Sequence, residues 1–487
     1  MIEVELKFQI PTAKRTALLK ALDPKKSNLI HLKAKYFDTP DKQLSQHGVA
    51  LRLRLEGEHW VQTLKAAGKS HLHRFEHNHD FGVSEHAPAL DLTIYQQEPE
   101  ALAILQQALG DQLDALKLQF ESDIQRTYRV IHFEDAEIEV SLDIGRLATE
   151  TEEREVHEVE FELKQGAIQS LLAFSFEWVK KYLLWLDVRS KAEMGHLLSI
   201  QQEVSPAKQA KAFQLVKKDS ADSNVRSLIA QQLQHLLPNI AAISAGVAQQ
   251  EHLEQAHLAL DHLYLTSALL RTWSKDVSDK WAYQLAAFKH HFEHLQQLEH
   301  MQRTLGALLQ NPTTTASLTK DILYAQEKLN NLVRSTLNVH HFLELLMFSL
   351  QSSTATQELD LKGYAQNTLQ QQYKQIHEQL AETDVTNFES LELLSQRIRE
   401  LKFSFPILTS IYDVKNLQKY SKALNEAHQA AEEYLTLSSS AAYIQQTELE
   451  ASDWFVLGWL TAKQEVYAQA LLDATEQFMV SRKFLKF

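Results

Sequence analysis

Glycine and proline, the residues that most often interrupt helices, are scarce and unevenly distributed in this chain of 487 residues. The sequence contains 12 glycines and 9 prolines, roughly 2.5% and 2%, against typical values near 7% and 5%. Eight of the glycines and five of the prolines precede residue 201, and the remaining 287 residues contain four of each. So few turn residues exclude an all-β chain and predict long helices in the second part.

The charge of the chain argues against general binding of polyanions. At pH 7 the formal net charge is −14, from 49 Lys and Arg and 63 Asp and Glu residues. Residues 1–200 contain 24 basic and 32 acidic side chains, and residues 201–487 contain 25 and 31. Neither part has the basic excess that is typical of nucleic-acid-binding domains, so we expect no nucleic-acid partner.

Cysteines and long apolar segments are both missing from the sequence. The cysteine count of 0 excludes disulfides, thiolate nucleophiles and zinc–cysteine sites. No segment approaches the ~18 consecutive apolar residues of a membrane span. The initial MIEVELKF has neither the basic start nor the apolar core of a signal peptide. These features predict a cytoplasmic protein without a membrane partner.

Alternation of charged and apolar residues predicts strands in the first part of the chain. Residues 1–8, 51–55, 137–144 and 156–164 each have one charged face and one apolar face, and shorter strands are expected around Lys65 and Arg74. Apolar residues that recur every three or four positions predict helices over 12–22, 98–109 and 167–183.

The helical period continues through the second part. It predicts helices over residues 224–237, 249–275, 281–309, 317–350, 357–380, 391–411, 414–435 and 453–478. Breaks are expected at Pro238, at Asn311–Pro312 and at the serines 438–440. The polar residues 201–223 are predicted to be a linker between a first domain, 1–200, and a helical domain, 224–487.

Strands with charges of both signs along one face indicate a closed sheet with a charged interior. For any single strand, a charged face is most simply the solvent side. Here, however, arginines and glutamates recur in register on nearly every strand. A charged interior is costly unless its charges pair with one another or with a ligand. A phosphate-rich ligand with a divalent metal satisfies both signs, so the residues favour a metal-dependent polyphosphate or nucleotide site.

Short motifs follow one another in order through the first part of the chain. They are Glu3-x-Glu5-x-Lys7, Tyr36-Phe37-Asp38-Thr39, Leu51-Arg52-Leu53-Arg54, Thr63-Leu64-Lys65, Arg74-x-Glu76, Arg126, Ile138-Glu139-x-x-Leu142-Asp143, Glu158-x-Glu160-x-Glu162 and Ser190-Lys191-Ala192-Glu193. The first motif alone is weak, but the ordered set over nearly 200 residues resembles the CYTH family of triphosphate tunnel metalloenzymes. The second part resembles the CHAD helical domain, and the arrangement is similar to bacterial CYTH–CHAD inorganic triphosphatases.

This resemblance implies an α+β fold, in which an eight-stranded antiparallel barrel or tunnel with covering helices precedes an all-α helical bundle. It also implies hydrolysis of tripolyphosphate to pyrophosphate and phosphate with Mg²⁺ or Mn²⁺ as cofactor. The implied phosphate ligands are Lys7, Arg52, Arg54, Lys65, Arg74, Arg126 and Lys191. The implied metal ligands are Glu3, Glu5, Asp143, Glu158 and Glu160. The residues assigned to catalysis are Glu3, Glu5, Lys7 and Lys65.

Three further glutamates share the charged faces, and two other kinds of function stay open. Glu76, Glu139 and Glu162 are expected to orient the basic side chains or to support the metal ligands.

Adenylate cyclase and thiamine triphosphatase activities use the same triphosphate grip, so the implied phosphate and metal ligands do not separate them from inorganic triphosphatase activity. A non-catalytic phosphate sensor is the alternative of a different class. The two carboxylate pairs argue against it, because a pure anion binder would not need them.

The helical part lacks much of the basic surface that the CHAD resemblance implies. Relatives usually have a histidine and several arginines at regular spacing on a helix of each half. Residues 256–266 lack these arginines, whereas residues 392–403 keep Arg397, Arg399 and Lys402. We therefore predict weak or no binding of long-chain polyphosphate by this part.

Overall fold

The chain divides into two compact units in the computed structural model, which describes residues 2–68, 73–110, 115–353, 360–412 and 417–481. The first unit contains Met1–Gln209 together with Gln234–Ala256 and Val333–Met347. The second contains Ala210–Leu233, His257–Leu332 and Phe348–Phe487. The domain boundaries at residues 200 and 223 stay predictions.

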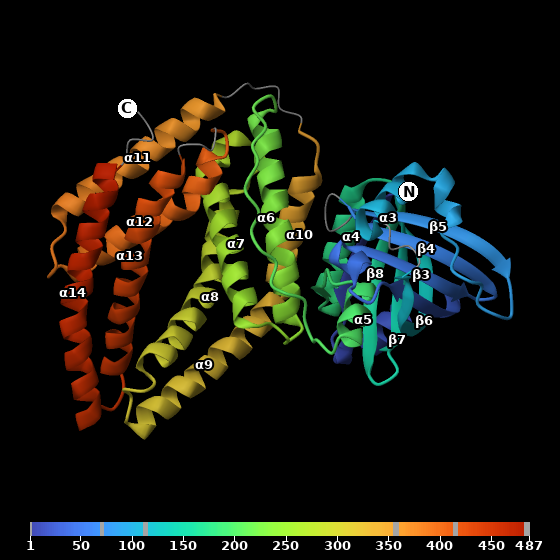
Figure 1. The fold of residues 1–487 in the computed structure, drawn as a ribbon, viewed down its shortest axis with the longest axis horizontal. Helices are drawn as coiled ribbons and strands as arrows, with labels where there is room; N and C mark the ends of the chain where they lie inside the picture. The colour runs from blue at the N-terminus through green and yellow to red at the C-terminus, as the bar shows by residue number, and fades with distance from the viewer. Residues whose placement is uncertain (1, 69–72, 111–114, 354–359, 413–416, 482–487) are drawn as a thin grey trace. The chain divides into compact units, whose positions relative to one another are not determined.

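A closed antiparallel barrel forms the centre of the first unit (Figure 1). Its strands are β1 (Ile2–Gln9), β2 (Asn28–Asp38), β3 (Val49–Glu56), β4 (His59–Ala67), β5 (His73–Val83), β6 (Lys117–Phe133), β7 (Ala136–Ala148) and β8 (Glu153–Gln165). Neighbouring strands follow the order β5-β4-β3-β2-β6-β7-β8-β1, and β1 also pairs with β5, which closes the sheet. The short β9 (Trp185–Leu186) pairs with the end of β1, at Phe8 and Gln9, on the side of β1 opposite β8. The predicted eight-stranded barrel is confirmed.

Apolar residues on the outer face of the barrel are covered by helices, because alternation along each strand separates them from the charged residues. Leu51 and Leu64 share a buried cluster with residues of α2 (Gln43–Gln46) and α3 (Pro99–Leu109). Elsewhere on this face, the ring of Phe161 meets Phe174 of α4 (Ile168–Tyr182) edge-on, with ring centroids 5.2 Å apart. The smaller α1 (Arg15–Ala21) follows β1.

One end of the barrel interior is apolar and is filled by α5 (Lys191–Ser199). Met194 and Leu198 of α5 belong to the same buried cluster as Tyr36 and Val156. Tyr36 lies opposite Arg52 in the sheet, and Val156 lies two residues before Glu158. Both side chains are therefore on the inner face, the same face as the charged residues. Helix α5 therefore closes this end of the interior, and its first residue, Lys191, lies at the boundary with the charged part.

Long helices make up the rest of the described chain, as the sequence predicted. They are α6 (Ala221–Ser244), α7 (Gln250–Leu269), α8 (Asp279–Leu305), α9 (Pro312–Val333), α10 (Thr336–Leu350), α11 (Leu361–Glu382), α12 (Phe388–Thr409), α13 (Leu417–Gln445) and α14 (Ala451–Ser481). The expected break at Asn311–Pro312 is confirmed, because α9 begins at Pro312.

Two expected helix breaks are wrong. Helix α6 continues through Pro238, and the fully buried Leu236 and Ile240 show that packing on both sides holds the helix together despite the missing backbone donor. Helix α13 continues through the serines 438–440, and the hydroxyl of Ser440 donates to the carbonyl of Thr436 at 2.7 Å within the same helix, so it does not compete for backbone groups in a non-helical turn.

One predicted helix, over residues 317–350, is two helices in the structure. Helix α9 ends at Val333, and α10 begins at Thr336. The hydroxyl of Ser335 accepts the backbone N–H of Asn338 at 3.3 Å, which is the capping interaction that starts a new helix.

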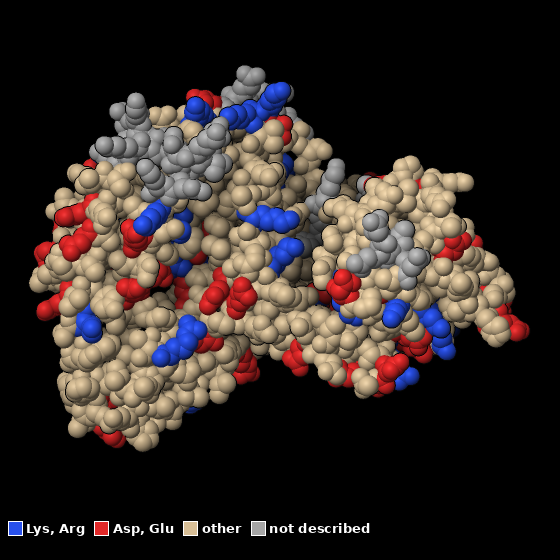
Figure 2. All heavy atoms as spheres, viewed as in Figure 1, with Lys and Arg blue, Asp and Glu red and all other residues tan. Residues whose placement is uncertain are grey.

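Charges of both signs are interspersed on the molecular face drawn in Figure 2. Among the residues described on that face, lysines and arginines do not gather into one continuous basic patch. Within the part of the chain that the structure describes, no helix has both the length and the apolar composition needed to cross a membrane.

Candidate active site

The predicted phosphate ligands line the inner face of the barrel. Six of them come from β1, β3, β4, β5 and β6, and Lys191 comes from α5. The strand register accounts for their common direction, because directly opposed residues of an antiparallel pair point to the same face. Lys7 lies opposite Glu160, Arg126 lies opposite Asp143, and Lys65 lies opposite Glu76.

Five charged side chains meet in what we call the barrel cluster, which consists of Asp143, Glu158, Glu160, Arg126 and Lys191. The Lys191 ammonium lies 2.7 Å from both Asp143 and Glu160 and also contacts Glu158. The Arg126 guanidinium donates to both oxygens of Asp143 at 2.7 Å and to Glu160 at 2.6 Å. One lysine and one arginine thus bridge three carboxylates.

The three carboxylates of the barrel cluster have different electrostatic environments. Burial alone would raise the pKa of Glu160, but Lys191 and Arg126 hold this pKa well below its ordinary value. The same two cations lower the pKa of Asp143 against the effect of burial. Burial wins at Glu158, whose pKa is raised despite the nearby Lys191 and Lys7. Glu158 is therefore the carboxylate whose negative charge is least compensated.

The barrel cluster has the donors that a hard divalent cation requires. Oxygens of Asp143, Glu158 and Glu160 lie within 4.8 Å of one another, and carboxylate oxygens are the ligands that Mg²⁺ and Mn²⁺ prefer. Glu158 is fully buried, yet neither of its oxygens makes a well-aligned hydrogen bond to the described residues. The buried Lys7 ammonium, 3.4 Å from Glu158, likewise has no aligned hydrogen bond among them. The residues present fit a metal and a phosphate group.

Glu3 and Glu5, the other two predicted metal ligands, pair with cations outside the barrel cluster. The Lys65 ammonium lies 2.6 Å from Glu3 and 2.9 Å from Glu76. Burial, opposed by Lys65 and reinforced by Glu5 and Glu76, raises the pKa of Glu3 to about 8. The predicted metal ligands thus form two groups along the interior.

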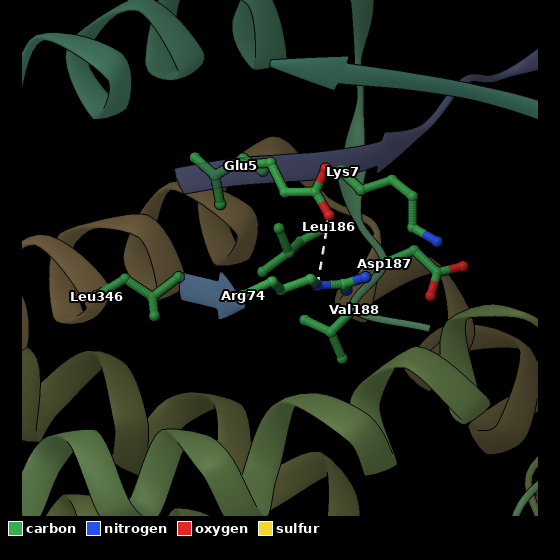
Figure 3. A pocket seen from close by; sticks show the side chains of 8 residues that line it. Glu5, Lys7, Arg74, Leu186, Asp187, Val188 and Leu346 are labelled. Atoms are coloured by element: carbon green, nitrogen blue, oxygen red, sulfur yellow. Dashed lines mark ion pairs between the residues drawn. The ribbon is translucent and has the colours of Figure 1, made fainter. Parts of the chain in front are cut away.

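Glu5 faces the phosphate ligand from β5. Its carboxylate lies 3.3 Å from the Arg74 guanidinium, and both side chains line a small pocket together with Lys7 and Asp187 (Figure 3). The other two arginines of the interior also have polar partners. Arg52 donates to the Tyr36 hydroxyl at 3.3 Å, and Arg54 donates to Glu56 at 2.6 Å.

The structure adds inner-face residues that the sequence analysis missed. Lys164 lies 2.7 Å from Glu162 and 3.7 Å from Glu139, so these two glutamates support a lysine that had not been singled out. The alternation of residues 158, 160 and 162 extends to position 164 and would have identified it. A buried ion pair between Asp187 and Arg189 was also missed, because it lies in a loop without periodicity.

Comparison with known proteins identifies the family of the barrel. Residues 1–193 match the model of the CYTH domain. They form a CYTH domain. An inorganic triphosphatase from Haemophilus influenzae is 31% identical over 172 residues, which are 34% of this chain and 46% of that relative. The match therefore spans about half the length of the relative.

Two solved structures are similar to stretches of the chain at low identity. A putative adenylyl cyclase from Hippeastrum with a dominant triphosphatase activity is 16% identical, with 42% of this chain and 98% of that chain covered and a TM-score of 0.28. The CHAD domain from Ricinus communis is 14% identical, with 57% and 96% covered and a TM-score of 0.48. The assignment of residues 224–487 to a CHAD domain stays a prediction.

Proposed function

We propose that this protein is a metal-dependent inorganic triphosphatase that hydrolyses tripolyphosphate to pyrophosphate and phosphate. The observation that carries the proposal is the barrel cluster, in which two cations bridge two buried carboxylates and one partly buried carboxylate inside a closed sheet. The inorganic triphosphatase from Haemophilus influenzae, 31% identical within the CYTH domain, supports the same substrate class.

The basic residues of the interior would bind the phosphate chain. Arg126 and Lys191 belong to the barrel cluster, Lys7 lies 3.4 Å from its Glu158, and Arg52, Arg54, Lys65 and Arg74 continue along the inner face. Each pairs with an internal carboxylate or hydroxyl. When substrate binds, each basic side chain would exchange this internal hydrogen bond for one to a phosphate oxygen. This exchange keeps the interior charges compensated in both states, which a buried set requires.

The carboxylates would hold the metal. Asp143, Glu158 and Glu160 form one set of ligands, and Glu3 and Glu5 belong to a second set on β1. Mg²⁺ or Mn²⁺, when bound, supplies neutralisation of phosphate charge and an acidified water. Lys7 and Lys65 would orient the terminal phosphate by binding its oxygens, and the apolar end filled by α5 would exclude bulk water.

Release of phosphate tests the proposal. Tripolyphosphate, ATP and thiamine triphosphate would each be offered with Mg²⁺ or Mn²⁺ to the intact protein and to Glu3→Ala. We expect metal-dependent release from tripolyphosphate that Glu3→Ala abolishes. The matched control is Glu121→Ala, because Glu121 lies on β6 as a half-exposed carboxylate, 54% accessible, and pairs with Lys35 outside the interior.

The outcomes separate the open alternatives. Preferential hydrolysis of thiamine triphosphate, or formation of cyclic AMP from ATP, would replace the inorganic substrate. Tight binding of tripolyphosphate without turnover would support a sensor. No release and no binding by folded protein would refute a triphosphate site altogether.

For the helical part we propose weak or no binding of long-chain polyphosphate. Arg399, one of the basic residues kept in α12, lies 3.0 Å from Glu293 and 3.4 Å from Asp261, so its charge is already compensated. Polyphosphate titration of the intact protein at two salt concentrations checks this. Tight binding that weakens steeply with salt, and that Arg399→Met removes, would contradict it.

A further inference from the structure

We propose that Asp187 and Arg189 are positioning residues that place Lys191 and Lys7 for phosphate binding, an inference that rests on the proposed function. Neither residue belongs to the barrel cluster as defined above. Both lie in the loop between β9 and α5, which joins the edge of the barrel to the helix that fills its apolar end.

The two side chains form a buried bidentate ion pair. Arg189 donates from Nε to Oδ1 of Asp187 at 3.0 Å and from Nη2 to Oδ2 at 2.8 Å. The backbone N–H of Arg189 also donates to Oδ1 at 3.0 Å. Asp187 is fully buried, and burial would raise its pKa, but Arg189 and Lys7 keep this pKa below its ordinary value. The pair is therefore charged, and it fixes the loop geometry through three hydrogen bonds.

Asp187 also attaches the loop to the strand that bears Lys7. Its backbone N–H donates to the carbonyl of Lys7 at 3.0 Å, and its Oδ2 accepts from the Gln9 amide at 3.2 Å. Figure 3 shows the Lys7 side chain extending toward the Asp187 carboxylate. The position of β1 and the position of the loop are thus coupled through one carboxylate.

The other end of the loop leads directly to Lys191. Ser190 follows Arg189 and caps α5 by accepting the backbone N–H of Glu193 at 3.1 Å. Lys191 is the first residue of α5, so the direction of its side chain depends on where the loop places the first turn of this helix. A buried ion pair provides little net stability compared with apolar packing. A positioning role explains why the ion pair of Asp187 and Arg189 lies between Lys7 and Lys191.

The test measures the environment of the lysines without requiring turnover. Trace acetylation of the intact protein, followed by peptide mass spectrometry, would give the reactivity of Lys191 and Lys7 relative to the exposed Lys422. In Asp187→Asn we expect the reactivity of Lys191 to rise about tenfold. We also expect the KM for tripolyphosphate to rise about 10- to 100-fold with kcat little changed, as for other outer partners of functional groups.

The matched control is Asp222→Asn, which removes a carboxylate buried to a similar degree, 2.9 Å from Arg226 in α6. This variant should lose stability without a change in KM or in Lys191 reactivity. Arg189→Gln is the second variant, because it keeps the contacts of Asp187 with Gln9 and Lys7 if Asp187→Asn does not fold.

The outcomes distinguish this inference from the proposed function. Unchanged Lys191 reactivity in a folded variant, or an equal rise in Asp222→Asn, would overturn the positioning role. If the unmodified protein releases no phosphate from tripolyphosphate, the proposed function fails, while the acetylation result still decides whether this ion pair positions the lysines.

Discussion

The two units of the chain contain charge clusters of nearly the same composition but of different electrostatic character. The barrel cluster has three carboxylates bridged by a lysine and an arginine. The counterpart in the second unit, which we call the helical cluster, consists of His257, Asp261, Lys289, Glu293 and Arg399. Each cluster contains three groups that could act as metal ligands within 4.8 Å of one another.

The carboxylates of the helical cluster are fully compensated. Lys289 lies 2.6 Å from Glu293 and 3.0 Å from Asp261, and Arg399 contacts the same two groups. Burial would raise the pKa of Glu293, but His257, Arg399 and Lys289 hold it below its ordinary value. The pKa of Asp261 is lowered in the same way. In the barrel cluster, by contrast, the pKa of Glu158 is raised.

This difference teaches that composition alone does not identify a site. A set of opposite charges that satisfies itself needs no ligand, and we expect the helical cluster to act by joining α7, α8 and α12. A set that leaves one buried carboxylate and one buried ammonium without aligned hydrogen bonds is arranged for a further partner, whereas among the described residues of the helical cluster the atom without one is Nε of Arg399, and both carboxylates are bonded. The predictions below test that distinction.

Loss of the bridging lysine should have the largest effect, and only in the barrel. We expect Lys191→Met to lower kcat/KM for tripolyphosphate by about 1,000-fold, because it removes a preorganised cation from the phosphate site. Lys289→Met, which removes the bridging lysine of the helical cluster, should leave kcat/KM unchanged. Steady-state kinetics of both variants would break the comparison if the two losses were similar.

Arg399→Met should act on stability instead of activity. It leaves the buried Asp261 with one cation fewer, and breaking a buried pair typically costs about 3–5 kcal/mol of unfolding free energy. Urea denaturation measures this loss, and the phosphatase rate of the folded variant should be that of the unmodified protein. A stability change below about 1 kcal/mol would mean that the helical cluster is not a structural network.

Acid should destabilise the barrel through His196 of α5. This imidazole is 7% exposed, and burial, against the effect of Asp38 at 3.8 Å, lowers its pKa to about 4. Between pH 6.5 and 4 the unfolded chain binds a proton here and the folded chain does not, so stability falls as the pH decreases. The loss approaches about 3 kcal/mol at pH 4.

Comparison of His196→Phe with His341→Phe sharpens this prediction. His341 of α10 has a pKa of about 4 through burial alone, without a carboxylate among its causes. Urea titrations at pH 7 and pH 5 give the loss of unfolding free energy on acidification. In each variant this loss should be smaller than in the unmodified protein by the contribution of one histidine. A variant whose acid sensitivity equals that of the unmodified protein would show that its histidine does not titrate in this way.

The smallest effects are expected at two helical glycines. A Cβ added to Gly195 of α5 would lie 2.0 Å from the Phe120 ring inside the barrel, so Gly195→Ala should cost about 1–3 kcal/mol. Gly458 of α14 has no heavy atom within 4 Å of such a Cβ, so Gly458→Ala should stabilise by about 1 kcal/mol. Thermal unfolding of both variants would contradict the tight fit of α5 if the shifts had the same sign.

Much of the barrel could be predicted from alternation, because a period of two directly reports which residues share a face. The strands that bear Glu3, Arg52 and Glu158 were found in this way. Strands β2 and β6 were not singled out, although burial alternates with a period of two over residues 32–38 and 120–125; the rest of each strand lacks this alternation. Closure of the sheet was inferred from the charges of both signs on the strand faces, and the number of strands came from the family resemblance.

Pairing between distant segments could not be predicted from local patterns. The sequence identified Asp143, Glu158 and Lys191 as site residues, but it did not separate them from Glu3 and Glu5, which pair with other cations. Arg399 and Asp261 are 138 positions apart, and neither helix shows a periodicity that would reveal their contact. Register and helix packing supply that information.

The closure of the barrel has a consequence for synthesis of the chain. β1 is the first strand to leave the ribosome, yet its partners are β5 and β8, and β8 ends at Gln165. Pairings between such distant segments are slow because a large loop must first be ordered. The edge of this strand that pairs with β8 therefore stays unpaired for most of the domain's translation, whereas β5, which ends at Val83, is made earlier. During this interval the alternating charges of β1 protect an unpaired edge against association with other nascent chains.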